Sequence, residues 1–192
     1  MTNAINVYAA SINERHAFEA TRTMSESNLK KLQKAARTVS TDAANAMLVA
    51  ANVDADFANA SVIENKRVDV YALEKLSNFV FCAQFYSNNM NDMNYYILRT
   101  LINCDDAQVM MTLKDAQDAC SAHRKTTNQL VVQNVEHKTD STVTAQHRST
   151  IAALVMLNIL EKTYNEKREV CFKLNNDNAI YVALREQLEA NA

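Results

Sequence analysis

The sequence predicts a mainly α-helical protein with a short two-stranded β-ribbon near its C-terminus. Apolar residues recur at intervals of three or four through most of the chain, which indicates amphipathic helices. Alternation at every second residue, typical of a strand, is clear only around residues 169–175. Hydrophobic residues make up 48% of the chain and charged residues 22%, so the composition supports a folded core.

The chain of 192 residues contains neither glycine nor proline. Phosphate-binding P-loops, dinucleotide fingerprints and nucleophile elbows all need glycine at fixed positions, so the sequence excludes these enzyme motifs. Asparagine occurs 22 times and is the next-best residue for left-handed backbone conformations. We therefore expect asparagine to end helices and form turns, as at Asn88-Asn89, Asn158, Asn165 and Asn175-Asn176.

Four helices are expected in the first half, at residues 4–20, 25–38, 42–52 and 67–87. The second carries Lys30, Lys31, Lys34 and Arg37, which form either a solvated face or a phosphate-contacting one. The fourth is rich in aromatic residues, and we expect these to lie in the core: Tyr71, Phe79, Phe81, Phe85 and Tyr86. A nucleic-acid stacking platform would need interleaved basic residues, and only Lys66, Arg67 and Lys75 are near in sequence.

The polar run from Asn88 to Asp92 is the best domain boundary in the chain. It divides an N-terminal helical region, residues 1–88, from a second domain at 89–176 and a final helix at 177–192. In the second domain we expect helices at 92–103 and from Thr112, a polar insert at 123–140, and a helix at 144–157. Thr112 and Asp115 have the spacing of a capping box.

The helix at 144–157 has two different sides. At about 100° per residue, Ile151, Leu154 and Val155 share one side with His147, so we expect this histidine to be buried. The opposite side is small and polar and could approach another surface closely: Ala145, Gln146, Ser149, Ala153 and Met156. The helix is expected to end at Asn158, a residue that tolerates a left-handed cap.

A β-hairpin is expected to follow this helix directly. Its first strand begins after Asn158, and its turn contains Asn165, Lys167 and Arg168. In the second strand Val170, Phe172 and Leu174 alternate and should face inward. Residues 123–173 hold eight basic and five acidic residues, a net charge of +3, whereas the whole chain has a net charge of −2. Of the three segments 1–122, 123–173 and 174–192, the one with a net positive charge therefore contains the helix and its hairpin.

The stretch from Ser149 to Lys162 resembles the recognition helix and the start of the wing in winged helix-turn-helix transcription regulators. Those proteins show L-x-x-L-x-x-x-G-[IL]-[LV]-E after a small polar run. The matching residues here are Ile151, Leu154, Asn158, Ile159, Leu160 and Glu161. The resemblance covers residues 92–175 and implies a C-terminal winged helix with a two-stranded β-wing. Asn158 replaces the usual glycine, and residues 123–140 stand where the family has a short turn, as either a lengthened helix or a loop.

The resemblance implies a sequence-specific binder of double-stranded DNA, a transcriptional regulator acting by site occupancy. Gln146, Arg148, Ser149 and Thr150 would face base edges or phosphates in the major groove. Lys167 and Arg168 at the wing tip, with Lys162 and Lys173 beside it, would contact phosphates or the minor groove. The alternative is a helical scaffold or a host-factor-binding protein that uses the winged helix for protein contacts.

Other groups of reactive residues have simpler explanations than a site. Cys104, Cys120, His123 and His137 match no standard zinc spacing, although Cys120 and His123 are locally suitable. Capping and solvation account for the acidic pairs Asp105-Asp106 and Asp115-x-x-Asp118. No Cys–His pair has a supporting context for nucleophilic catalysis. We therefore expect no enzyme, no metal and no cofactor.

Partners and location follow from the remaining features. The final helix carries Ile180, Tyr181, Leu184 and Leu188 on one side, which would pack on its own domain or on a second subunit. A homodimer is expected, with residues 1–88 serving dimerisation or partner contact. No signal peptide and no membrane span are expected, and the thiols suit a reducing cytoplasm. The composition suggests a bacteriophage or mobile-element protein in its host's cytoplasm.

Overall fold

Four helices and a short β-ribbon build the first half of the chain. The computed structural model describes residues 6–22, 24–59, 61–63, 66–85, 89–134 and 140–190. The helices are α1 (Val7–Ala20), α2 (Glu26–Val39), α3 (Asp42–Ala50) and α4 (Val70–Phe85), with β1 (Ser61–Ile63) pairing with β2 (Lys66–Arg67) between the last two. Ser25 and Thr41 cap α2 and α3 by accepting hydrogen bonds from backbone N–H groups. The four helices predicted in this half are confirmed.

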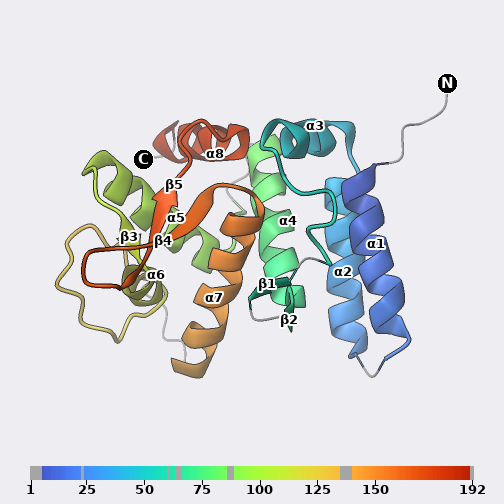
Figure 1. Ribbon diagram of the computed structural model, residues 1–192, viewed down its shortest axis with the longest axis horizontal. Coiled ribbons are helices and arrows are strands. Elements are labelled where there is room, and N and C mark those ends of the chain that lie inside the picture. The colour runs from blue at the N-terminus through green and yellow to red at the C-terminus, as the bar shows by residue number, and fades with distance from the viewer. Residues whose placement is uncertain are drawn as a thin grey trace.

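Helices and a small sheet alternate in the second half. The elements are α5 (Asp92–Asp106), β3 (Met111–Thr112), α6 (Leu113–Ala119), α7 (Asp140–Met156), β4 (Leu160–Tyr164), β5 (Val170–Leu174) and α8 (Ala179–Ala190). The strands form an antiparallel sheet in the order β3-β5-β4 (Figure 1). The fold is thus mainly α-helical with a small β-sheet, as predicted. The sequence did not show β3, because a strand of two residues is too short to produce an alternating pattern.

The start of α6 and the end of α7 have the capping interactions that the sequence predicted. Thr112 and Asp115 form a reciprocal capping box at the start of α6. At the end of α7 the backbone of Asn158 is left-handed, with φ of 59°. The N–H of Asn158 donates to the Val155 carbonyl and that of Ile159 to the Leu154 carbonyl, which is the Schellman pattern. Asparagine therefore takes the place of glycine where the chain turns into β4.

Helix α4 occupies the centre of the molecule (Figure 1). On one side it packs against α2, which pairs with α1, and on the other side it packs against α7. Helix α8 lies across its end together with α3. Ten of the sixteen residues of α4 are buried, so nearly its whole circumference is covered by neighbouring helices.

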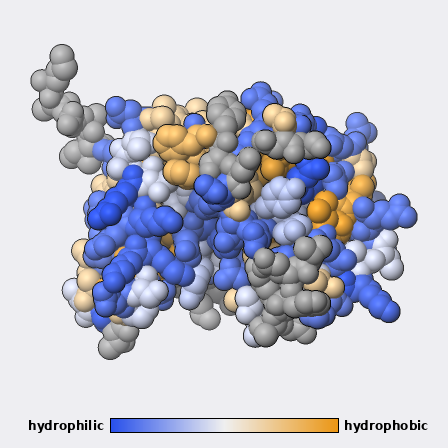
Figure 2. All heavy atoms as spheres, turned by 180° about the vertical axis from the view of Figure 1, so that it is seen from behind, coloured by the Kyte–Doolittle hydropathy of each residue, from blue (hydrophilic) through white to orange (hydrophobic). Residues whose placement is uncertain are grey.

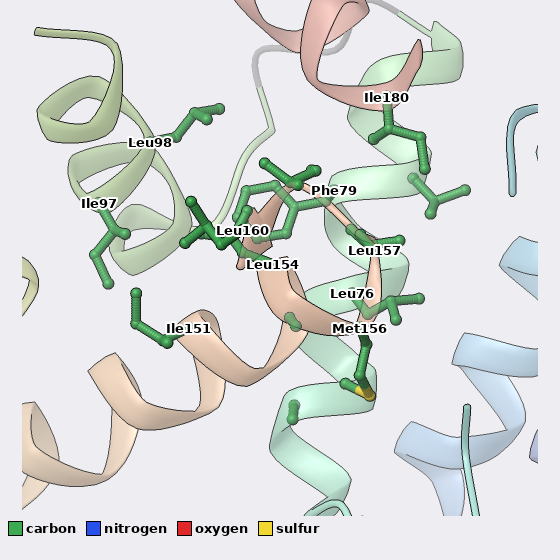
Figure 3. Packing of buried hydrophobic residues seen from close by; sticks show 14 of the residues in the cluster. Leu76, Phe79, Ile97, Leu98, Ile151, Leu154, Met156, Leu157, Leu160 and Ile180 are labelled. Atoms are coloured by element: carbon green, nitrogen blue, oxygen red, sulfur yellow. The ribbon is translucent and has the colours of Figure 1, made fainter. Parts of the chain in front are cut away.

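One hydrophobic core extends across the predicted domain boundary. Phe79 and Leu76 of α4 point toward Leu154 of α7, toward Leu157 just after that helix, and toward Ile180 of α8 (Figure 3). Buried residues of α1 and α2 belong to the same cluster. Buried residues of both predicted regions therefore share one core cluster, and the division at residue 88 stays a prediction. The asparagine-rich run marks a turn between α4 and α5, because polar composition reports solvent exposure of a loop and not independence of its flanking elements.

The aromatic residues of α4 do not all lie in the core. Phe79 is fully buried, but Tyr71, Phe81 and Phe85 are exposed, and Tyr86 lies outside the described residues. The three exposed rings share one stripe of the helix: ten residues separate Tyr71 from Phe81, and four separate Phe81 from Phe85. That stripe is the one side of α4 that neighbouring helices leave open, so the expectation of burial is wrong for these three rings.

The predicted insert, residues 123–140, contains no helix in its described part except at its last residue, Asp140, where α7 begins. Residues 121–134 form a coil that lies against α5 and α6. Of the two alternatives for the insert, a lengthened helix or a loop, this part is therefore a loop. The Asn103 side chain donates to the Leu130 carbonyl, and the N–H of Val132 donates to the Thr100 hydroxyl. Residues 135–139 lie outside the described residues.

The C-terminal helix packs on its own chain. Ile180, Tyr181, Leu184 and Leu188 are buried, as the spacing predicted. Arg185 holds the helix to α5, with N–O distances of 2.8 Å to Asp105 and 2.6 Å to Asp106. The acidic pair Asp105-Asp106 thus has a structural partner.

Candidate nucleic-acid interface

From Ser149 onward the small polar side of α7 lies inside the protein, whereas Ala145 at its start is exposed and Gln146 is half-buried. Ser149 is 3% exposed and Thr150 is completely buried. The Ser149 hydroxyl is 3.2 Å from an Asp69 carboxylate oxygen, just before α4. The expectation that this side faces outward is wrong for this part, and with it the assignment of Ser149 and Thr150 to a DNA surface. Small side chains allow close approach between helices, and here the second helix belongs to the same chain.

A buried hydrogen-bond network fixes Thr150. Its hydroxyl donates to Oδ1 of Asn94 in α5 at 3.1 Å. The Asn94 amide group in turn donates to the Lys75 carbonyl and to Oδ1 of Asn78, each at 3.1 Å. The network joins α4, α5 and α7 at one point, so polarity in this part of α7 serves the packing of the helices.

A different stripe of α7 faces solvent. Ser141, Ala145 and Arg148 are exposed, and they lie on one side of the helix at intervals of four and three residues. Gln146, beside them, is half-buried. Arg148 therefore stands at the surface of the N-terminal half of α7, with small neighbours that do not obstruct it.

The β4–β5 hairpin forms directly after this helix, as predicted. Phe172 is buried, and Val170 and Leu174 are partly buried. Residues opposite one another across the ladder point to the same face, so Lys162 shares a face with Phe172, whereas Lys173 lies on the other face opposite Glu161. The two lysines therefore cannot contact one surface together. Lys162 projects from the face that turns toward the helices.

The turn of the hairpin presents two cations. Lys167 and Arg168 are exposed, and Arg168 adopts a left-handed backbone with φ of 61°. Asn165 closes the turn: its side-chain oxygen accepts the N–H of Glu169 at 2.9 Å. The hairpin from residue 160 to 174 contains four basic and three acidic residues, a net charge of +1. The turn itself, residues 165–169, holds two basic and two acidic residues, so Glu166 and Glu169 flank its two cations.

His147 is an interior residue, as predicted. It is buried, and its Nδ1 lies 2.9 Å from the Val143 carbonyl. Burial lowers the pKa of His147 below its ordinary 6.5, and the positive charges of Arg148 and Arg124 lower it further, whereas the bond to Val143 opposes the shift.

The protein should lose stability as pH falls through about 6.5, because the unfolded chain takes up the proton that folded His147 resists. The loss should continue down to the lowered pKa of the folded state. Urea denaturation across this pH range should show a smaller change in midpoint for His147→Gln. The exposed His123 gives the matched control, His123→Gln, which should retain the dependence. An unchanged pH profile in His147→Gln would contradict this role.

The cysteines form no metal site among the described residues, where no group of three or more His, Cys, Asp and Glu side chains converges. All four cysteines are buried and unpaired by disulfides. Burial raises the pKa of the Cys82 and Cys104 thiols to about 11, which keeps them protonated and unreactive at neutral pH.

A second surface with cations lies between α2 and α4, and it includes two of the lysines for which the sequence left a solvated or a phosphate-contacting face open. A groove of about 460 Å³ is lined there by Lys31 and Lys34 of α2, by Lys75, Asn78 and Phe81 of α4, and by the asparagines that follow α4. The sequence patterns could not indicate the groove itself, because its two helices are far apart along the chain and only their packing brings the side chains together.

Comparison with known proteins finds no match to this chain. No family model, no curated protein and no solved structure matches it. No helix in the described part of the chain is both long enough and apolar enough to cross a bilayer. On the face in Figure 2, hydrophilic side chains predominate and apolar ones form small, separate patches.

Proposed function

We propose that this protein binds double-stranded DNA through the N-terminal half of α7 and the β4–β5 hairpin. The proposal depends on one observation. The order α5–β3–α6–α7–β4–β5, with strands in the order β3-β5-β4, places a hairpin directly after a helix that has one open side. This is the arrangement that the resemblance to winged-helix regulators implies, in which the helix enters the major groove and the hairpin lies along the backbone.

The contacting residues are a reduced set of those predicted. Arg148, with Gln146 beside it, would reach base edges, since arginine can donate two hydrogen bonds to guanine and glutamine can pair with adenine. Lys162, Lys167 and Arg168 would neutralise phosphates. Ser149 and Thr150 are excluded by burial, and Lys173 by its position opposite Glu161 on the other face of the hairpin.

The three proposed phosphate contacts determine how steeply binding should depend on salt. For duplex DNA the logarithm of the binding constant falls with that of salt concentration, with a slope of about −0.9 per phosphate neutralised. The proposed cations therefore predict a slope of roughly −3. Removing one phosphate contact should reduce the steepness by about 1.

The test is a salt titration of binding to random and genomic duplex DNA, with the oligomeric state measured alongside. The Lys167→Ala/Arg168→Ala variant should reduce the slope by about 2 and weaken binding to every sequence. Arg148→Ala should weaken binding to the preferred sequence by about 1–3 kcal/mol and relax its specificity.

Two controls separate the proposed face from general positive charge. Lys173→Ala removes a cation from the same hairpin but from the opposite face, and Arg22→Ala removes an exposed arginine at the end of α1. Both should leave the slope unchanged. If the control variants weakened binding as much as the hairpin variants, or if no variant changed the slope, the assignment of this face would fail.

A further inference from the structure

The groove between α2 and α4 combines positive charge with an exposed aromatic ring, Phe81, and the ring of Phe85 lies beside Phe81 outside the lining. Helix α2 carries four basic residues and one acidic residue, a net charge of +3 over fourteen residues. Lys31 and Lys34 line the groove from that helix, and the almost completely buried Lys75 lines it from α4. Glu74 is the only acidic residue among its described lining, so the lining has a net charge of +2.

The three lysines are held differently. Lys31 lies 3.0 Å from the Glu74 carboxylate, and its ammonium group stands 4.0 Å from the centre of the Tyr71 ring. Lys75 donates to the side-chain oxygen of Asn91. Lys34 is exposed and has no acidic partner among the described residues. Lys34 is therefore the cation of the groove that a bound anion would meet first.

Aromatic rings follow the same open stripe of α4. Phe81 is 37% exposed and Phe85 is 58% exposed, and their ring centres are 4.9 Å apart. Tyr71 lies at the other end of the stripe, about 21 Å from Phe85 along the helix axis at the rise of an α-helix. Exposed phenylalanine costs solvation free energy that burial elsewhere would avoid, so this stripe has the character of a binding surface.

Cations beside exposed aromatic rings suit one ligand chemistry better than others. Single-stranded nucleic acid offers a phosphate backbone for the ammonium groups and unpaired bases that stack on aromatic faces. Asn78, Asn89 and Asn91 complete the lining of the groove, and hydrogen bonds within the protein hold the Asn78 and Asn91 side chains in place. A duplex would present its phosphates but keep its bases away from Phe81 and Phe85.

We propose that the α2–α4 groove binds single-stranded nucleic acid, with Lys34 and Lys31 along its backbone and Phe81 and Phe85 stacking on its bases. This site is separate from the face of α7 and the hairpin, and it stands whether or not that face binds duplex DNA.

The test measures the affinity of the full chain for a fluorescent oligothymidine of about 16 nucleotides, by anisotropy. Phe81→Ala and Phe85→Ala should each weaken binding about 5-fold to 150-fold, the range for loss of one stacked base. Lys34→Glu should also weaken the affinity for oligothymidine. The loss should be larger at low salt, since the effect is electrostatic. Both phenylalanines and Lys34 are exposed, so thermal unfolding of the variants should match that of the parent chain.

Matched variants outside the groove provide the controls. Phe18→Ala removes a ring of similar exposure from α1, and Lys125→Glu reverses an exposed lysine in the coil that follows α6. Neither should change the affinity for oligothymidine by more than the error of the measurement. The Lys167→Ala/Arg168→Ala variant should bind oligothymidine like the parent chain, which separates this site from the hairpin.

Four results would overturn the proposal. The chain could fail to bind oligothymidine, or the groove variants could bind it like the parent. The groove variants could weaken duplex binding equally, which would make the groove part of a duplex site. Finally, polyglutamate of the same charge could displace the strand with equal potency, which would assign the groove to an acidic protein partner.

Discussion

Phe79→Ala should destabilise the protein by about 3–5 kcal/mol, the usual cost of removing a buried phenylalanine ring. Phe79 is fully buried where α4 meets α7 and α8 (Figure 3), so few neighbours can move to fill the space. The free energy of unfolding of a domain is only about 5–15 kcal/mol, so the variant should be only marginally stable. Urea denaturation followed by circular dichroism measures the loss.

The same experiment tests whether the halves of the chain fold together. Because α4 packs against both α2 and α7, the loss should appear in a single cooperative transition for the whole chain. Phe85→Ala is the matched control on the same helix: its ring is 58% exposed, and its removal should change stability by no more than about 0.5 kcal/mol. Two separated transitions in the Phe79→Ala variant would show that residues 1–88 and 89–176 fold independently after all.

Asn94→Ala should destabilise the protein by about 2 kcal/mol or more, second only to the loss of the Phe79 ring. The substitution takes a hydrogen-bond partner from the Thr150 hydroxyl, the Lys75 carbonyl and the Asn78 amide oxygen. Each buried polar group left unsatisfied costs about 1–3 kcal/mol. Because Thr150 is completely buried, its hydroxyl cannot exchange Asn94 for bulk water without local opening.

A double-mutant cycle isolates the contact between α5 and α7. Thr150→Val removes the hydroxyl at nearly constant volume, and the coupling free energy with Asn94→Ala should be about 1 kcal/mol. Thermal or urea denaturation of the two single variants and the double variant provides it. Strictly additive effects would mean that the two side chains do not interact, and would reopen the question of whether Thr150 serves another surface.

The part of the site that could be predicted was the part built by local interactions. The stop of α7 at Asn158, the capping box of Thr112 and Asp115, and the hairpin after residue 159 depend on residues within a few positions of one another. The burial of His147 followed from helical periodicity alone, since it shares a side with Ile151 and Leu154. Arg148 and the turn cations Lys167 and Arg168 are exposed because charged groups are costly to bury.

The errors share one physical cause. Periodicity shows that α7 has a small polar side and an apolar side, but a small polar side can face water or a second helix equally well. The chain supplies α4 and α5 as neighbours, with Asp69 just before α4 and Asn94 in α5 positioned to satisfy Ser149 and Thr150. The same packing leaves Phe81 and Phe85 exposed, although their apolar character alone indicated burial.

Local sequence therefore determined the elements of this protein: where its helices begin and end, where its hairpin turns, and which class of fold results. Only the tertiary structure decided which sides of those elements remain open and which distant residues meet, as Lys34 and Phe81 do across the α2–α4 groove. The reason is that backbone hydrogen bonds and caps act within a few residues, whereas burial depends on helices separated by tens of residues along the chain.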